Sequence, residues 1–372
     1  MTTAREAAAP GVVDALTLAP LYVDEVILST VRDTHQAFAK RVFGALGQPA
    51  GLPRRLHDGI STGVYAGIGA GLTAAGAALR TARKAGVTGP PLPPVIQSAI
   101  TGVVGDRIRD DAHAMHFEMA VRMRGEDVPL DHVHLEAAFP TATGKVVIFL
   151  HGLCESEAIW TRPGALTYGQ TLATQGWTPI LLRFNSGLSI RENGAALASL
   201  LQRLTEAWPT DVTRIALVGH SMGGLIARAA TAIDAKQDWT SRLTDVVCLS
   251  TPHLGAPLAR QAMVGGKLLK VLPESAAFGR IIDHRSVGII DLESVLDLPN
   301  LDHVRYRLVS AQMSGVAGFL LGDLLVRRGS AHGRSRRGDL FPGADVLHLA
   351  NTNHFGLLGH PDVHEKLKEW LA

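Results

Sequence analysis

The hydrophobic positions of the chain follow different periods before and after about residue 130. Before that point apolar residues recur at helical spacing in three segments: 14–46, 59–85 and 95–111. A proline-rich loop at 89–94 separates the last two. After residue 130, short apolar runs alternate with amphipathic segments. The change of period predicts a helical N-terminal region, 1–130, followed by an α/β domain, 131–372.

The second region is typical of alternating strands and helices. Apolar runs predict strands over 132–139, 145–150, 178–184, 214–218, 245–249, 304–310 and 345–349. Helical patterns predict helices over 166–175, 190–208, 222–233 and 361–370. This alternation favours a mostly parallel sheet with helices on both faces. The stretch 254–300 is too long for an ordinary connection, so it predicts a lid or cap.

Composition narrows the class of protein. Of 372 residues, 46% are hydrophobic and 19% are charged, which excludes a disordered chain. Two cysteines, Cys154 and Cys248, cannot form a disulfide scaffold. A net charge of +2 does not favour a nucleic-acid partner. The first 20 residues have no secretory signal pattern, so we expect a cytoplasmic protein.

One segment of the N-terminal region has no charge from residue 59 to residue 79. As a helix it would span about 31 Å, the thickness of a bilayer core. Its glycines recur every four residues beside a row of aliphatic side chains: Gly59, Gly63, Gly67 and Gly71 beside Ile60, Val64, Ile68 and Leu72. On a helix the glycine row forms a shallow groove beside the aliphatic row, and such a groove allows another helix to approach very closely.

Large apolar side chains are too few in this segment to favour a membrane span. We expect its groove to pack within the protein or between two copies in a homo-oligomer. Peripheral membrane contact is the less favoured alternative. The helix could also cover or extend an acyl-binding pocket.

The sequence Gly219-His220-Ser221-Met222-Gly223 follows an expected strand and opens an expected helix. In a G-x-S-x-G elbow the serine lies on a tight turn, and the flanking glycines provide clearance. The helix N-terminus behind it favours a developing anion. The alternative is a glycine-rich turn that happens to contain a serine. The strand before and the helix after favour Ser221 as a nucleophile.

A serine nucleophile needs a base and an acid that orients the base. His354 follows the last expected strand and precedes the closing helix, which is the expected place for the base. Asp323 follows the strand before that one, in a Gly-Asp turn, and we assign it as the orienting acid. It is the weakest of the three assignments, because the segment between Ser310 and Asp323 is long.

Other histidines and acids compete for these roles less well. His348 lies within a strand, and His360 and His364 belong to the region of the closing helix, where we expect solvated side chains. Among the other acids, Asp345 starts a strand and Asp339 follows an arginine-rich loop. Asp302 precedes its strand, at the wrong end for the site.

The oxyanion of the reaction needs two backbone N–H groups. The residue after the nucleophile, Met222, would supply one. The loop His151-Gly152-Leu153-Cys154, after an apolar strand, would supply the other from Leu153. We expect His151 to brace this loop. Cys154 lies near the site, but no base accompanies it.

The loop 327–337 contains five arginines. An anionic partner such as a phospholipid head group would fit it, but a solvated, mobile insertion is the favoured interpretation. Metal-ligand spacings such as C-x-x-C and H-E-x-x-H are absent from the sequence, so we expect no metal and no cofactor.

Three motifs together resemble the α/β-hydrolases of the lipase and esterase kind: LHGL, GHSMGG and STPHLGAP, the last at 250–257. Over about 131–372 the chain is most similar to bacterial hydrolases grouped with GPI inositol-deacylase-like (PGAP1-like) proteins. The resemblance implies an α/β-hydrolase fold and cofactor-free hydrolysis of carboxylic esters. It carries the catalytic roles to Ser221, Asp323 and His354, and the oxyanion donors to Leu153 and Met222.

The sequence therefore predicts a serine esterase or lipase that forms an acyl-enzyme on lipid-like or medium-chain esters. An acyltransferase or thioesterase would use the same triad. A membrane-associated lipid-binding protein on a hydrolase fold is the alternative from another class.

Overall fold

A computed structural model describes residues 10–22, 51–87, 89–111, 114–161, 166–233, 237–256, 286–314, 323, 325–335 and 338–372. The chain divides by contacts into two compact units. The first contains the described residues up to Gln97, with 114–115. The second contains Ser98–Asp111 and the described residues from His116 onward. Part of the expected N-terminal region, 98–111 and 116–130, therefore packs with the sheet.

The first unit is built from two helices, α1 (Val12–Tyr22) and α3 (Gly51–Lys84). They are joined by an ion pair of 2.6 Å between Arg83 Nε and Asp14 Oδ1, and Asp14 is buried. The N–H of Val12 donates to the Pro90 carbonyl, which ties the loop after α3 to the start of α1. No helix in the described part of the chain is long and apolar enough to cross a membrane. Residues 23–46 of the expected first helix lie outside the described residues.

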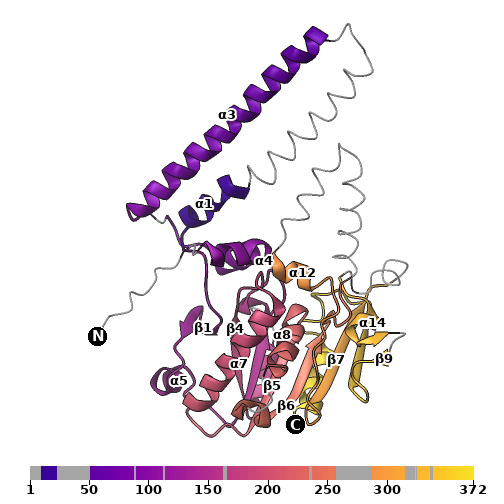
Figure 1. Ribbon diagram of the computed structural model, residues 1–372. Coiled ribbons are helices and arrows are strands. Elements are labelled where there is room, and N and C mark those ends of the chain that lie inside the picture. Colours follow the sequence, from indigo (N-terminus) through magenta and orange to yellow (C-terminus); the bar gives the residue numbers. More distant parts are fainter. Residues whose placement is uncertain are drawn as a thin grey trace. The chain divides into compact units, whose positions relative to one another are not determined.

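The second unit contains an eight-stranded sheet in the order β10-β7-β6-β5-β3-β4-β1-β2 (Figure 1). Its strands are β1 (Ala120–Met123), β2 (Glu126–Val128), β3 (Lys145–Leu150), β4 (Trp177–Arg183), β5 (Arg214–His220), β6 (Leu243–Leu249), β7 (Arg305–Gln312) and β10 (Asp345–Ala350). Six strands are parallel, while β1 runs antiparallel to both β2 and β4. The predicted fold class, a mostly parallel sheet with helices, is confirmed.

Side chains of the central strands alternate between two cores. In β3, Val146, Ile148 and Leu150 belong to the core beneath α7 (Ile190–Ala207) and α8 (Met222–Thr231). Val147 and Phe149 belong to the opposite core, beneath α6 (Tyr168–Ala173) and α15 (Pro361–Trp370). A strand buried on both faces reads as a continuous apolar run, which is why KVVIFL predicts it so clearly.

The remaining elements are short, apart from one helix. They are α4 (Pro94–Asp110), α5 (His132–Ala138), η3 (Glu157–Trp160), α9 (Asp238–Arg242), α12 (Val287–Asp291), α14 (Arg328–Ala331), β8 (Arg334–Ser335) and β9 (Gly338–Asp339). The helix α4 is kinked at Val104. Of the expected lid, 257–285 lies outside the described residues, and α12 belongs to the described remainder.

Two sequence predictions near residue 130 were wrong. The expected strand at 132–139 is the helix α5, because the Asp131 carboxylate caps it by accepting from the His134 N–H and Leu135 packs inward. The N-terminal region is not wholly helical, since it contributes the hairpin β1–β2. That hairpin turns at Arg124 and Gly125, which both have positive φ, at 53° and 87°.

Candidate active site

Ser221 lies at the junction of β5 and α8 with φ 52° and ψ −119°, a strained conformation for a residue other than glycine. Its N–H donates to the Leu249 carbonyl at 2.8 Å. A Cβ on Gly223 would lie 2.5 Å from the Leu150 oxygen, so the turn closes only with glycine there. Crowding from the neighbouring strand thus holds the serine on the tight turn that the motif predicts.

His354 and Asp323 form a buried pair. The Nδ1 of His354 lies 2.8 Å from Asp323 Oδ2, and the backbone N–H of His354 donates to the Asp323 carbonyl at 3.0 Å. The other carboxylate oxygen accepts from the N–H groups of Leu325, at 3.0 Å, and Val326, at 2.7 Å. The structure thus brings the two predicted residues together, with the carboxylate held by its own turn.

Ser250 is a further member of this group that the sequence analysis missed. It follows β6 with φ 49°, and its hydroxyl donates to the same Asp323 oxygen that bonds His354. The signal was present in the STPHLGAP motif, where a serine ends the strand next to the elbow. Its hydroxyl fixes the carboxylate from a third direction.

Burial and hydrogen bonding shift the pKa values of Asp323 and His354. Burial alone would raise the pKa of Asp323, but hydrogen bonds from His354, Ser250 and the Val326 N–H outweigh it and lower that pKa. Burial lowers the pKa of His354, and the charge of His220 lowers it further, although Asp323 opposes both. At neutral pH these shifts favour an ionised carboxylate beside a neutral imidazole, which is the state a general base needs.

Ser221 and His354 line the same cavity, of about 190 Å³. Its other lining residues are mostly apolar: Leu153, Pro252, Ala256, Ile289, Leu292, Leu325, Val326 and Phe355, with Glu155 as the one carboxylate among them. An apolar cavity with few convergent polar groups is the usual form of a small-molecule site.

One of the two expected oxyanion donors lines this cavity, and the other follows a residue that lines it. Leu153 lines it directly, and Met222 is the first residue of α8 behind Ser221. Among the described residues, no acceptor takes either backbone N–H. His151 braces the loop, as its Nε2 accepts from the Phe184 N–H and its ring stacks on Phe184.

The remaining histidines have structural contacts. His348 bonds the Ser310 hydroxyl, and His360 caps α15 by accepting from the Asp362 N–H. The expectation that His364 is solvated was wrong. It is buried against Tyr168 and bonds the Thr171 hydroxyl at 2.7 Å.

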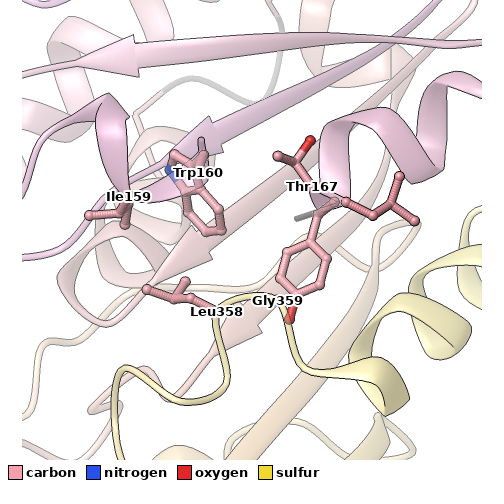
Figure 2. A pocket seen from close by; sticks show the side chains of 7 residues that line it. Ile159, Trp160, Thr167, Leu358 and Gly359 are labelled. Atoms are coloured by element: carbon pink, nitrogen blue, oxygen red, sulfur yellow. The ribbon is translucent and has the colours of Figure 1, made fainter. Parts of the chain in front are cut away.

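A second hollow lies beside α15 and is shown in Figure 2. Trp160 and Ile159 of η3 face Leu358 there, with Thr167 nearby. Its volume of about 10 Å³ has room for about one water molecule. None of the expected site residues lines it, and its volume is too small for an ester substrate.

Part of the arginine loop packs against the turn that follows β6. Ser330 of α14 accepts from the Leu254 N–H and donates to the Gly255 carbonyl, so this segment fastens the turn that follows Ser250. Residues 336–337 lie outside the described residues. In the part of the chain that the structure describes, no group of three or more His, Cys, Asp or Glu side chains could hold a metal ion.

The strand order, the helices on both faces and the strained serine between β5 and α8 define an α/β-hydrolase fold. The family model of the PGAP1-like alpha/beta domain matches residues 183–273, about a quarter of the chain, which confirms the resemblance seen in the motifs. The match includes the elbow and the STPHLGAP turn, but neither Asp323 nor His354. No match was found among curated proteins.

Solved structures of bacterial hydrolases are similar over about three fifths of the chain. The mature form of a Bacillus licheniformis lipase is 19% identical, covering 61% of this chain and 92% of its own, with a TM-score of 0.46. A Bacillus subtilis carboxylesterase is 14% identical, covering 61% and 84%, with a TM-score of 0.38. A thermophilic esterase from Thermogutta terrifontis is 14% identical, covering 62% and 90%, with a TM-score of 0.40. The fold assignment rests on the chain's own strand order.

Proposed function

We propose that the chain is a serine hydrolase of carboxylic esters. The observation that carries this proposal is the convergence of a strained serine and a buried His–Asp pair on one apolar cavity. Ser221 is the nucleophile, His354 the general base and then acid, and Asp323 the group that holds the imidazole in the required tautomer.

The reaction follows from these positions. The Ser221 oxygen attacks the ester carbonyl while His354 takes its proton, and the tetrahedral oxyanion binds the N–H groups of Leu153 and Met222. The protonated His354 then gives its proton to the leaving alcohol as the ester C–O bond breaks. Water, activated by the same imidazole, attacks the acyl-enzyme, releases the carboxylic acid and restores the serine.

The cavity lining supports an aliphatic acyl group in the substrate. Leu153, Ile289, Leu292 and Val326 offer methyl and methylene contacts, and each buried CH₂ of an acyl chain contributes about 0.8 kcal/mol. A longer chain therefore gains binding energy for as long as it stays inside the cavity. Lipid-like or medium-chain esters are the substrate class that this lining favours.

A series of p-nitrophenyl esters of increasing acyl length tests the proposal. We expect the wild type to hydrolyse them with a preference for chains longer than acetyl, and the variant Ser221→Ala to lose that activity. Equal rates for both proteins on every ester would contradict the proposal. Adding alcohols or thioesters and identifying the products separates hydrolysis from acyl transfer.

A further inference from the structure

Glu155 is a largely buried carboxylate, with its side chain 10% exposed, beside the proposed oxyanion donors. Its side chain lines the cavity, and its Oε2 accepts from the N–H of Gly152, the residue just before Leu153. A Cβ at Gly152 would lie 2.8 Å from that oxygen and 3.1 Å from the Ser221 Cβ. The carboxylate therefore fits against the loop only because residue 152 is glycine.

The same oxygen of Glu155 lies 2.9 Å from Nδ1 of His220, which is completely buried. His220 is the residue before Ser221. Its other ring nitrogen, Nε2, lies 3.2 Å from the backbone carbonyl oxygen of His354. One side-chain pair therefore joins the loop that carries Leu153, the turn that carries Ser221 and the loop that carries His354.

The hydrogen-bond partners determine how many protons the pair carries. Burial would raise the pKa of Glu155, but His220 and the Gly152 N–H outweigh burial and lower that pKa, so the carboxylate is ionised and only accepts. The His354 carbonyl is also an acceptor. Both partners are hydrogen-bonded only when each ring nitrogen of His220 carries a proton, and His220 is then an imidazolium beside the carboxylate.

We propose that Glu155 and His220 form a buried ion pair that positions the catalytic machinery, holding the Leu153 N–H, Ser221 and His354 in register. This inference rests on the proposed ester hydrolysis. Neither residue touches the reacting atoms, so both are positioning residues. The two charges of the ion pair also cancel. The negative charge of the carboxylate alone would destabilise a nearby oxyanion, and the positive charge of the imidazolium compensates for it.

Substitution of both partners tests the pair. The variants Glu155→Gln, His220→Asn and the double variant are compared with wild type in kcat and KM on one chromogenic ester. We expect each single variant to lower kcat about 10–100-fold with KM within about twofold of wild type, because the donors and the base move while the acyl cavity stays intact. The double variant should be no worse than the worse single variant.

Glu157→Gln is a matched control. Glu157 is also buried, lies two residues away, and pairs with Arg122 Nε at 3.0 Å instead of with the site. We expect this variant to lower the melting temperature with little change in kcat. The same loss of kcat in Glu157→Gln would show that removal of a nearby buried charge is enough, and would overturn the proposal.

The protonation of His220 supplies a measurement besides activity. We expect ¹⁵N NMR of the wild type at pH 7 to show both ring nitrogens of His220 protonated, and Glu155→Gln to show one. A neutral His220 ring in wild type, additive effects in the double variant, or losses confined to KM would overturn the proposal. Wild type no faster than Ser221→Ala on any ester would instead overturn the proposed function, and with it the positioning role.

Discussion

Glycine has opposite surroundings in the two units of the chain. In α3 the glycines at 59, 63, 67 and 71 are exposed, and an added Cβ at any of them meets no atom of the described residues within 4 Å. At the elbow, by contrast, an added Cβ at Gly223 or Gly224 would clash with neighbouring atoms. The first set leaves a surface open, while the second allows a strand, a helix and a loop to meet around one serine. Regular spacing of glycine along a helix therefore indicates less about where the chemistry takes place than close packing around glycine at a turn does.

The expected packing of the α3 groove within this chain is not seen among the described residues. Packing between two copies and contact with a bilayer stay predictions. Substitutions in the α3 groove and at the crowded turn should affect stability and activity to very different extents.

The largest effect is expected from Asp323→Asn. The amide keeps the shape but favours the wrong tautomer of His354, so kcat should fall by about 10⁴ with a small change in KM. Steady-state kinetics on a chromogenic ester measures this. A fall of less than tenfold would assign the orienting role to another acid.

The next effect is expected from Gly223→Ala. The new methyl would lie 2.5 Å from the Leu150 oxygen and 2.6 Å from the His151 oxygen, and backbone cannot move aside easily. We expect a loss of about 3 kcal/mol in stability and at least about 100-fold in activity. Urea unfolding and ester kinetics measure the two losses. A variant with wild-type stability would show that the turn is not crowded.

The pH profile should give a smaller, graded effect. His354 must be neutral to accept a proton, and its pKa is lowered by burial. The value of kcat/KM should therefore be constant near pH 7 and fall about tenfold per pH unit only below the lowered pKa. A profile that already falls between pH 8 and pH 7 would contradict a lowered pKa for the base.

The smallest effect is expected from Gly63→Ala, the counterpart of Gly223→Ala. An exposed helical alanine stabilises a helix by about 1 kcal/mol relative to glycine. Amide exchange in α3 should therefore slow about fivefold, with ester hydrolysis unchanged. Faster exchange, or loss of an oligomer in sedimentation, would show that another helix occupies the groove.

Much of the second unit could be predicted from the sequence because its strands are buried on both faces. The closing helix begins and ends where the pattern places it, at Pro361 and Trp370. The helix α5 could not be predicted, since Val133 and Leu135 alternate like a strand while the Asp131 cap decides the outcome.

In the site, the elbow motif and the order of the strands predicted Ser221 and His354 as partners, and both side chains line one cavity. The motif STPHLGAP carried a signal for Ser250, but the roles of Glu155 and His220 could not be predicted. Their contact joins segments more than 60 residues apart, and no local spacing encodes such a contact.

The central claim is that Ser221 is a nucleophile activated by His354 and Asp323. Labelling with a fluorophosphonate probe, followed by mass spectrometry of the digested protein, tests it most directly. We predict one covalent adduct, on the peptide that contains Ser221, which is absent in Ser221→Ala and strongly slowed in Asp323→Asn. No adduct on wild type, or an adduct that persists in Ser221→Ala, would contradict the claim.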